Sequence, residues 1–563
     1  MSRNKFALML TSAICATSAI GAGAANAAVA DVFGGGASLP APYARSAADC
    51  YGVKMDLINA AAVGATTPSL VTLADFNYTG AVPFDCAAST VNSNARIFYS
   101  STGSGRGIQA FGSHDPLFFG DIDPNTSGIQ TQGSVSYALS ETAVSAAQVG
   151  FYNNGGLFTT GVTVVAAGAT PGVGQYANPK EKYGNMIQYP FLIAPVTIAY
   201  DPVYKKVRQA DGSIKEYKFN LFRSLVRSSG GLRLNQDTYC KIFNGQITNW
   251  NDPALKALNN NYSLKDPTDP VSNVNFSVPL QIAGRSDSSG TTSLWTRHLA
   301  AACASQTPNA YADSTSTLPA SLQGVVYDKA TANTTPAGTP GLYVRAAGND
   351  GVAKYIDFTA EPTMTTGNTV IQGRMGYVGP DFTLPAAAVT LANNYNLHTA
   401  SLQNASGAFV APTPDSAVAS FGTRLPPDST SKGVYDPASL DSRSRTNPAD
   451  WVEGASKTSA LANPTAAKGY PIVGTSNILL YTCYASSSQF SALIGYLKWY
   501  NTSPVVSDST LGILANSGFA PMPVAWRTAI NDTFFTNKSG LGLYMTTKGR
   551  AGSGCTASGI VGG

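Results

Sequence analysis

Residues 285–292 read RSDSSGTT and stand between an apolar run at 278–283 and an amphipathic segment at 293–299. The apolar run is typical of a strand, and small hydroxyl residues with a glycine before a helical pattern are typical of a helix start. The first turn of a helix leaves backbone N–H groups without partners, and the positive end of the helix dipole faces the same point. The stretch therefore predicts a strand, a tight loop and a helix that together can hold a tetrahedral oxyanion.

Two charged side chains in this loop fit the same kind of ligand. Arg285 carries a planar, permanently charged guanidinium that can donate two parallel hydrogen bonds to an oxyanion. Asp287, two residues further on, can hold that guanidinium in one orientation. The alternative interpretation is an ordinary capped helix with a surface arginine, and this segment alone does not decide between the two.

Two further loops have the same pattern. They are residues 33–43, FGGGASLPAPY, and residues 99–111, YSSTGSGRGIQAF. Each predicts a strand end, a turn rich in glycine and serine, and a helix start. The second lacks the Gly-Lys-Ser/Thr ending of a Walker A loop and is not a convincing dinucleotide fingerprint. Each loop is a weak signal in a chain with 55 glycines, but three such helix starts in one chain favour a shared site.

The order of these loops resembles the phosphate-binding proteins of bacterial ABC importers (PstS-like proteins) and their relatives, the DING proteins. The Arg-x-Asp-x-Ser-Gly-Thr signature of that family matches Arg285, Asp287 and residues 289–291 without a gap. The other similar stretches are residues 34–43, 103–108, 239–250, 348–352 and 373–378. Residues 31–36, DVFGGG, resemble a variant of the amino terminus that names the DING group.

The resemblance implies a two-lobed α/β fold of the periplasmic-binding-protein type (type II), with two crossover strands at the hinge and large loop insertions. The crossings are expected at 189–200 and 470–481, where a Tyr-Pro pair precedes an apolar run. Lobe one would then combine residues 31–191 with 478–563, and lobe two would be residues 192–477. Closure of the lobes would bring the donors of both onto a ligand between them.

The resemblance also implies a ligand set for inorganic phosphate. The expected binding residues are Ser38, Leu39, Ser104, Arg285, Ser289, Gly290 and Thr291, with Asp287 positioning Arg285. A carboxylate that accepts the proton of hydrogen phosphate discriminates against sulfate, because ionised sulfate has no proton to offer. In the family this acceptor follows the second loop by about one helix, after a Phe-Gly pair. Asp123 is therefore the expected acceptor, with Asp121 in reserve, and no cofactor or metal is expected.

The composition fits an exported protein. Charged residues make up 12% of the chain, about half the usual share. The net charge of +4 falls to about +2 without Arg3 and Lys5, and no basic run indicates a nucleic-acid partner. Residues 1–30 have the charged, apolar and small-residue regions of a signal peptide, and no other segment has the apolar length to span a membrane. We expect a periplasmic or secreted protein, with an ABC importer complex as a potential partner.

The cysteines fit the same compartment. Loss of the leader removes Cys15 and leaves six cysteines, an even number that favours three disulfides in an exported chain. Fifteen pairings are open. Neighbour pairing is expected because each bond then lies within one lobe of the implied fold, and the pairs are Cys50–Cys86, Cys240–Cys303 and Cys483–Cys555. Buried free thiols are the alternative.

Two other functions stay open. Some phosphate-binding relatives are secreted phosphatases, so phosphomonoester hydrolysis is the main alternative, although the chain has neither an HExxH nor a G-x-S-x-G motif. His114, His298 and His398 show no metal-ligand spacing, and His298 is expected to pack against its surroundings. A surface or assembly protein that reuses the fold would account for the extra length near 125–180, 205–230, 305–345 and 383–465.

Overall fold

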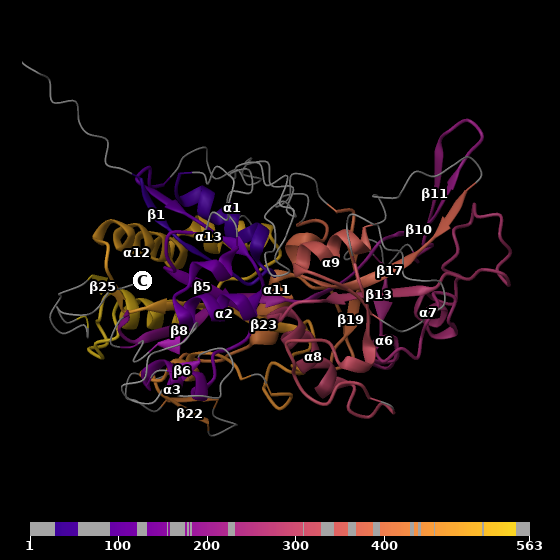
Figure 1. Cartoon of the computed structure of the whole chain (residues 1–563). Coiled ribbons are helices and arrows are strands. Elements are labelled where there is room, and N and C mark those ends of the chain that lie inside the picture. Colours follow the sequence, from indigo (N-terminus) through magenta and orange to yellow (C-terminus); the bar gives the residue numbers. More distant parts are fainter. Residues whose placement is uncertain are drawn as a thin grey trace, which may run out of the picture.

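The computed structural model shows two α/β lobes side by side, with the strands β8 and β23 in lobe one and the β13–β17 region in lobe two (Figure 1). The structure describes residues 29–53, 91–120, 132–154, 156–157, 175–176, 180, 183–222, 231–307, 309–327, 343–357, 368–386, 395–427, 433–436, 441–454, 456–508, 512–547 and 555. None of the helices within these ranges combines the length and the apolarity that crossing a membrane requires.

Lobe one is built on a five-stranded sheet with the order β4-β2-β5-β23-β8. Its strands are β2 (Gly34–Gly36), β4 (Ser100–Ser101), β5 (Tyr137–Ser140), β8 (Met186–Pro195) and β23 (Val473–Tyr481). The strands β4, β2 and β5 run parallel, so their carboxyl ends lie at one edge of the sheet. The helices of this lobe are α1 (Ala41–Tyr51), α2 (Ser104–Ser113), α3 (Ala146–Asn154), α12 (Ser487–Thr502), α13 (Pro504–Ser507), α14 (Ile513–Asn516) and α15 (Val524–Ile530).

Lobe two is built on a six-stranded sheet with the order β14-β15-β13-β17-β9-β18. Its strands are β9 (Thr197–Tyr200), β13 (Leu280–Arg285), β14 (Gln323–Val326), β15 (Tyr343–Ala346), β17 (Gly373–Val378) and β18 (His398–Thr399). The neighbours β14, β15, β13 and β17 are parallel. The helices of this lobe are α6 (Gln236–Phe243), α7 (Pro253–Leu258), α8 (Gly290–Ala302), α9 (Gly348–Ile356) and α11 (Pro414–Phe421).

Small sheets decorate the two lobes. They are β1 (Ala30–Val32) with β3 (Ala95–Ile97), β6 (Gly156–Leu157) with β7 (Gln175–Tyr176), β12 (Arg233–Leu234) with β19 (Ser401–Gln403) and β20 (Phe409–Val410), β21 (Gly433–Asp436) with β22 (Asp441–Arg443), and β24 (Cys483–Tyr484) with β25 (Thr546–Thr547). A further sheet of β11 (Ile214–Lys218), β10 (Val203–Arg208) and β16 (Thr369–Ile371) projects from lobe two as an arm (Figure 1).

Two long strands join the lobes. The strands β8 and β23 pair antiparallel from Met186–Tyr481 to Pro195–Val473, and every residue of both is buried. After Val196 the chain of β8 continues directly into β9 of the second sheet. The two-lobed α/β fold with two crossover strands that the sequence predicted is therefore confirmed. The lobe boundaries at 191/192 and 477/478 stay a prediction, and both fall within these strands.

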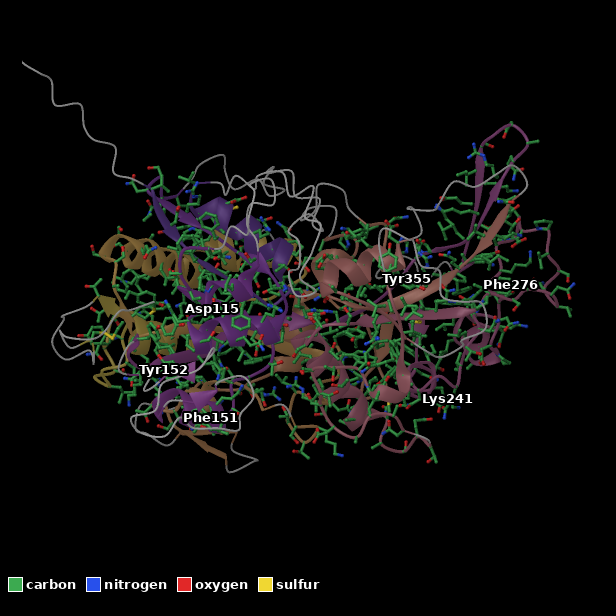
Figure 2. The ribbon with its side chains drawn as sticks, viewed as in Figure 1. Asp115, Phe151, Tyr152, Lys241, Phe276 and Tyr355 are labelled. Carbon is green, nitrogen blue, oxygen red and sulfur yellow. A yellow bond between two sulfur atoms is a disulfide. The ribbon has the colours of Figure 1, made fainter. Side chains whose placement is uncertain are left out.

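Aromatic side chains fill much of the interior of both lobes (Figure 2). In lobe one the ring of Tyr152 stacks on Phe111 with centroids 5.9 Å apart. In lobe two the ring of Tyr355 carries the guanidinium of Arg374 at 4.6 Å. Tyrosine dominates these contacts, and burial of each ring removes a large apolar area from water while its hydroxyl needs a partner.

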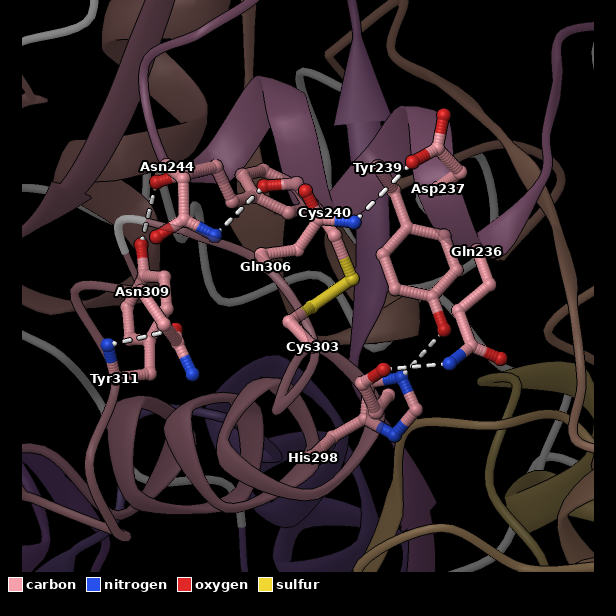
Figure 3. Close-up of a disulfide and its surroundings, with 12 residues drawn as sticks. Gln236, Asp237, Tyr239, Cys240, Asn244, His298, Cys303, Gln306, Asn309 and Tyr311 are labelled. Atoms are coloured by element: carbon pink, nitrogen blue, oxygen red, sulfur yellow. Dashed lines mark hydrogen bonds between the residues drawn. A yellow bond between two sulfur atoms is a disulfide. The ribbon is translucent and has the colours of Figure 1, made fainter.

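Each lobe has a disulfide between segments that are far apart in the sequence. Cys240 in α6 is bonded to Cys303 at the end of α8, beside the contact between Tyr239 and His298 (Figure 3). Cys483 is bonded to Cys555. Both predicted pairs are confirmed. Cys50 is disulfide-bonded as well, and its predicted partner Cys86 lies outside the described residues. In the chain-entropy account, the 63-residue separation of Cys240 and Cys303 stabilises the fold by about 4 kcal/mol.

Peptide mapping of the protein under non-reducing conditions is expected to return Cys240–Cys303 and Cys483–Cys555, and Cys50–Cys86 as the third pair. Denaturation without reductant should expose no alkylatable thiol in the mature chain. Six alkylatable thiols would contradict the exported, oxidised state, whereas Cys50 bonded elsewhere would contradict only the third pair.

Candidate functional site

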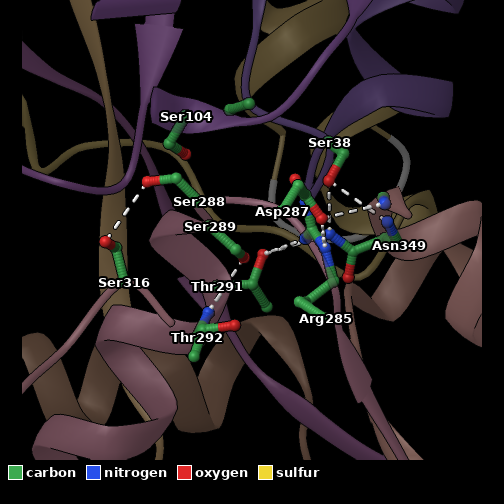
Figure 4. Close-up of polar contacts among 12 residues, drawn as sticks. Ser38, Ser104, Arg285, Asp287, Ser288, Ser289, Thr291, Thr292, Ser316 and Asn349 are labelled. Carbon is green, nitrogen blue, oxygen red and sulfur yellow. Dashed lines mark hydrogen bonds and ion pairs between the residues drawn. The ribbon is translucent and has the colours of Figure 1, made fainter. Parts of the chain in front are cut away.

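Loops from both sheets converge on one buried point between the lobes (Figure 4). In each lobe these loops follow the carboxyl ends of parallel strands, which is where open α/β sheets bind their ligands. Ser38 follows β2 and Ser104 follows β4 in lobe one. Arg285 ends β13 and Asn349 follows β15 in lobe two. The parallel register of each sheet therefore brings together residues that lie more than 300 positions apart in the chain.

The guanidinium of Arg285 is buried at this point and fixed by Asp287. Its Nε donates to Asp287 Oδ1 at 2.7 Å, and its Nη2 forms an ion pair with Asp287 Oδ2. Burial lowers the pKa of Arg285, but the adjacent carboxylate of Asp287, together with Tyr377 and Asp350, raises it, and the net shift is upward. The carboxylate also accepts from the backbone N–H of Gly348 at 3.2 Å. Asp287 therefore holds the arginine in one orientation, as the sequence predicted, while Nη1 faces Thr291 Oγ1 at 3.4 Å.

The hydroxyl groups of Ser38, Thr291 and Ser289 lie near the guanidinium, and each acts as an acceptor in its hydrogen bonds. Ser38 Oγ accepts from the backbone N–H and from Nδ2 of Asn349, at 3.1 and 2.9 Å. Thr291 Oγ1 accepts from Asn349 Nδ2 at 3.0 Å. Ser289 is the N-cap of α8, and its Oγ accepts from the backbone N–H of Thr292 at 3.1 Å. Each hydroxyl is an acceptor in these bonds, so each keeps its own hydrogen for a further acceptor such as an oxyanion.

Glu141 is an acidic residue of lobe one that the structure places among these donors. It follows β5 directly and is buried, with Oε2 accepting from Ser104 Oγ at 2.8 Å and Oε1 accepting from Ser476 Oγ at 3.0 Å. A side chain on Gly290 would come within 2.7 Å of Glu141, so the first residue of α8 lies directly against the carboxyl group. Burial raises the pKa of Glu141, while both hydroxyls and the charge of Arg285 oppose that rise. A carboxyl poised in this way can accept a proton from a ligand.

Sequence reasoning had assigned the acceptor to Asp123, with Asp121 in reserve, and both lie outside the described residues. Glu141 was missed because the chain around it, YALSET, contains no motif. The available signal was its position at the carboxyl end of a short apolar run, the same position that Arg285 has in lobe two.

The two lobes contact each other around the site. The backbone N–H of Gly105 donates to the carbonyl of Ser288 at 3.2 Å, and Thr142 Oγ1 lies 3.3 Å from Ser293 Oγ. Gly103 has φ of +91° and faces Asp287 so closely that a side chain there would overlap the carboxylate. Gly103 and Gly105 of the second loop are thus required by a close approach between the lobes, in addition to the turn that the sequence predicted.

The other predicted residues also lie in this region, and one unpredicted amide links them. Leu39 is buried, with its carbonyl close to Gly379 of lobe two. Gly290 and Thr291 begin α8. Asn349 was absent from the predicted ligand set, although its stretch had been noted as similar to the family. Its Oδ1 accepts from the backbone N–H of Gly379 in lobe two at 3.0 Å, and its Nδ2 donates to Ser38 Oγ in lobe one. The amide of Asn349 therefore links the two lobes.

His298 lies away from these loops, and the prediction of a packing role fits its contacts. Its Nδ1 is 2.9 Å from the carbonyl of Ala462, which can only accept, so Nδ1 carries the hydrogen and Nε2 accepts from Tyr239 Oη at 3.0 Å. Burial lowers the pKa of His298 to about 4. Within the described ranges no group of three or more His, Cys, Asp or Glu side chains has the arrangement of a metal site.

Comparison with known proteins shows which proteins the chain is similar to. The family model described as a PBP superfamily domain matches residues 22–501. Alkaline phosphatase L of Pseudomonas aeruginosa is 27% identical over 311 residues, which span 54% of this chain and 62% of that protein, just under two thirds. For strain PAO1 of the same species the alignment with alkaline phosphatase L is 25% identical over 462 residues, 81% of this chain and 88% of that protein.

Two further similarities cover most of the chain. A phosphate-binding protein of an unknown prokaryotic organism is 26% identical over 453 residues, 80% of this chain and 90% of that protein. The crystal structure of the ancestral soluble variant of the human phosphate binding protein aligns with 94% of this chain and 99% of its own, with a TM-score of 0.52 and 21% identity. At that identity the structural likeness supports the fold.

Proposed function

The chain belongs to the PBP superfamily, and we propose that it binds inorganic phosphate in the cleft between its two lobes. The observation that carries this proposal is that a buried, permanently charged arginine and a buried carboxyl group lie among hydroxyl groups where the two lobes meet. Arg285 supplies the charge for an oxyanion, and Glu141 supplies an acceptor for its proton. A relative that is similar over four fifths of the chain is named as a phosphate-binding protein, which supports the same ligand.

The donors would come from both lobes. The hydroxyls of Ser38, Ser289 and Thr291 keep their hydrogens for an acceptor, and the helix start at Gly290 leaves backbone N–H groups free for the same purpose. The fork of Arg285 adds charge-assisted bonds, which are about twice as strong as neutral ones. A tetrahedral anion is the ligand whose oxygens can use donors from several directions at once.

Glu141 would make the site selective. A site of donors alone binds phosphate and sulfate equally well, because both are tetrahedral anions of similar size. An ionised Glu141 accepts the proton of hydrogen phosphate, whereas a sulfate oxygen placed there would face an unpaired carboxylate in a buried environment. We therefore assign to Glu141 the role that sequence reasoning gave to Asp123.

Titration calorimetry of the mature protein with phosphate, arsenate and sulfate tests the proposal. Phosphate and arsenate should bind tightly with one site per chain, because both carry a proton at neutral pH, and sulfate should bind weakly. Absence of phosphate binding would overturn the proposed function, and equal affinities for phosphate and sulfate would overturn the role of Glu141.

The cellular setting is part of the proposal. We propose a periplasmic or secreted protein, because the two described disulfides form and persist in oxidising compartments. Delivery of phosphate to an ABC importer complex is the partner interaction that fits a closing, two-lobed binder. Cell fractionation, followed by phosphate uptake in a strain that lacks the protein, tests both parts.

Phosphomonoester hydrolysis is the second candidate, because three alignments at 25–27% identity are with alkaline phosphatase L. Release of phosphate from a phosphomonoester by the purified protein tests it. Turnover that disappears in Arg285→Ala would assign hydrolysis to this cleft, and turnover that persists in that variant would point to a contaminating enzyme.

Replacing Asn349 with alanine is expected to weaken phosphate binding about tenfold. The amide holds the oxygens of Ser38 and Thr291 in place, so its loss frees both hydroxyls to rotate and costs hydrogen bonds of about 1 kcal/mol each. Calorimetry measures the change. Asn404→Ala is the matched control, because Asn404 is also buried but donates only to carbonyls at 466–469. Equal affinity losses in the two variants would contradict a local effect.

A further inference from the structure

Ser476 is a buried hydroxyl on the hinge strand that touches the acceptor of the proposed site. It lies in the middle of β23, is completely buried, and donates from Oγ to Glu141 Oε1 at 3.0 Å. None of the three loops that resemble the family contains it. The bond joins residues that are 335 positions apart and connects the acceptor to a strand that crosses between the lobes.

The geometry of the hinge aims this hydroxyl at Glu141. Alternate residues of a strand share a face, so Ser476 points to the same side as Gly474, whose missing side chain leaves room for Leu294 of α8. Opposite Ser476, the partner strand is irregular: Leu192 pairs with Ser476 and Pro190 pairs with Asn477, so Phe191 is an extra residue. Such bulges re-aim side chains beside functional sites and accommodate a proline inside a sheet.

Ser104 and Ser476 occupy one oxygen each of the Glu141 carboxyl group. Ser104 Oγ donates to Oε2 at 2.8 Å, and the backbone N–H of Glu141 in turn donates to Ser104 Oγ at 3.3 Å. Two hydroxyl donors satisfy an ionised carboxylate better than a protonated one, which would have a hydrogen of its own to place.

Charged and titratable groups from both lobes face the same carboxyl group. Burial raises the pKa of Glu141, and the hydroxyls of Ser104 and Ser476 and the cation of Arg285 act against that rise. The buried carboxyl of Asp381, whose own pKa is raised well above its usual range by burial, is near enough to repel the charge of Glu141, and the phenol of Tyr99 is the other titratable neighbour. Each donor to Glu141 therefore matters for its protonation.

We propose that Ser476 is a positioning residue that sets the selectivity of the site by holding Glu141 as an ionised acceptor at neutral pH. This inference rests on the proposed function. With Glu141 ionised, hydrogen phosphate donates its proton to the carboxylate and is preferred over sulfate. With Glu141 protonated, the carboxyl group becomes a donor, and sulfate can accept from it without an unpaired charge.

Loss of the hydroxyl in Ser476→Ala removes one donor to the ionised form and favours the protonated form. In the wild type, the phosphate preference is present above the folded pKa of Glu141 and lost as the pH falls through it. The pH at which the preference is lost should move upward in Ser476→Ala, and the ratio of phosphate to sulfate affinity at neutral pH should fall about tenfold, the loss expected for one hydrogen bond to a charged group.

Calorimetry with inorganic phosphate and with sulfate between pH 5 and pH 8.5 measures this shift. Ser476→Thr keeps a hydroxyl at the same position and should follow the wild type. Thr475→Val is the matched control, because Thr475 is buried in the same strand but its hydroxyl donates to Asn477. The titration of phosphate itself is the same for every variant, so it cancels in the comparison.

The proposal is supported if the pH at which the phosphate preference is lost moves upward in Ser476→Ala and returns to the wild-type value in Ser476→Thr. A selective wild type with an unchanged pH profile in Ser476→Ala would overturn this assignment alone, whereas a wild type that does not bind phosphate would overturn the proposed function with it. If Ser476→Ala does not fold, Ser476→Cys takes its place, because the thiol is a weaker donor of similar size. The pH at which the phosphate preference is lost should then move upward by a smaller amount. An unchanged pH in Ser476→Cys would overturn the proposal.

Discussion

Replacing Arg285 with alanine is expected to weaken phosphate binding by about 2–4 kcal/mol, or roughly 30- to 1,000-fold, because it removes a desolvated, charge-assisted contact and leaves Asp287 without its ion-pair partner. The guanidinium is buried and held on two sides by the Asp287 carboxylate, so no water or neighbouring side chain can replace it without rearrangement. Calorimetry of the variant with phosphate measures the loss, and thermal denaturation without ligand separates a weakened site from a weakened fold.

Two companion variants sharpen this prediction. Arg285→Lys should recover only part of the affinity, because an ammonium is a point charge and cannot replace a fork that binds Asp287 and an oxyanion together. Arg345→Ala removes a cation from β15 of the same lobe, whose guanidinium donates to Gly324 and Gln323, and should leave binding unchanged. Equal affinities in wild type, Arg285→Ala and Arg285→Lys would remove Arg285 from the site.

The Arg285 loop could be predicted from sequence because its functional groups are contiguous. A strand, a serine-glycine turn and a helix start occupy residues 278–302, so one local pattern fixes both the backbone N–H groups and the arginine. The ion pair with Asp287 spans two residues and needs no knowledge of the fold. The same holds for Ser38, which follows the glycine strand β2, and for Ser104, which follows β4 and the turn residue Gly103.

Glu141 and Asn349 could not be derived in that way. The environment of Glu141 depends on Ser104, 37 positions away, and on Ser476, 335 positions away, so only the assembled sheet reveals it. Asn349 acquires its role from Ser38, 311 positions away in the other lobe. Residues whose function depends on pairing between distant strands carry no local signature, whereas residues at helix starts do.

The projecting arm of β10, β11 and β16 is a second feature that pattern alone left open. The sequence indicated extra length near 205–230, and the structure forms β10 and β11 there, with β16 added from residues 369–371. Lys205 in β10 forms a buried ion pair with Asp269 at 2.8 Å, which fixes the base of the arm to the loop after α7. The part of the insertion that the structure describes, residues 205–222, therefore extends lobe two through β10 and β11.

Replacing Glu141 with glutamine is expected to remove the preference for phosphate over sulfate. The amide is nearly isosteric, but its Nε2 donates, so it can accept from only one of the two serine hydroxyls and presents a donor to the ligand. Phosphate affinity should fall by about 1.5–3 kcal/mol, the range for a hydrogen bond to a charged group, while sulfate affinity rises. Competition calorimetry at pH 8, where we expect the wild type to prefer phosphate, measures both.

Without ligand, the thermal stability of Glu141→Gln relative to the wild type should also depend on pH. Burial raises the folded pKa of Glu141 above its unfolded value, so this carboxyl contributes stability that is fully present below the unfolded pKa and is lost as the pH rises through the folded pKa. Glutamine cannot ionise and has no such loss. The melting temperature of Glu141→Gln relative to wild type should therefore increase between acidic and alkaline pH in the absence of ligand, and a flat difference would contradict a raised pKa.

The variant Asp123→Asn completes the test of which carboxyl group accepts the proton, because Asp123 is the acceptor that the family resemblance implies. If Glu141 accepts the proton, Asp123→Asn should retain both the affinity and the selectivity of the wild type, and the double variant should match Glu141→Gln. If Asp123→Asn alone removes the preference for phosphate while Glu141→Gln retains it, the acceptor is Asp123, and the buried carboxyl of Glu141 serves to hold Ser104 against the hinge strand. The two assignments of the acceptor thus predict opposite results for the ratio of phosphate to sulfate affinity. That ratio is measured in Asp123→Asn and in Glu141→Gln, both of which are nearly isosteric with the wild type.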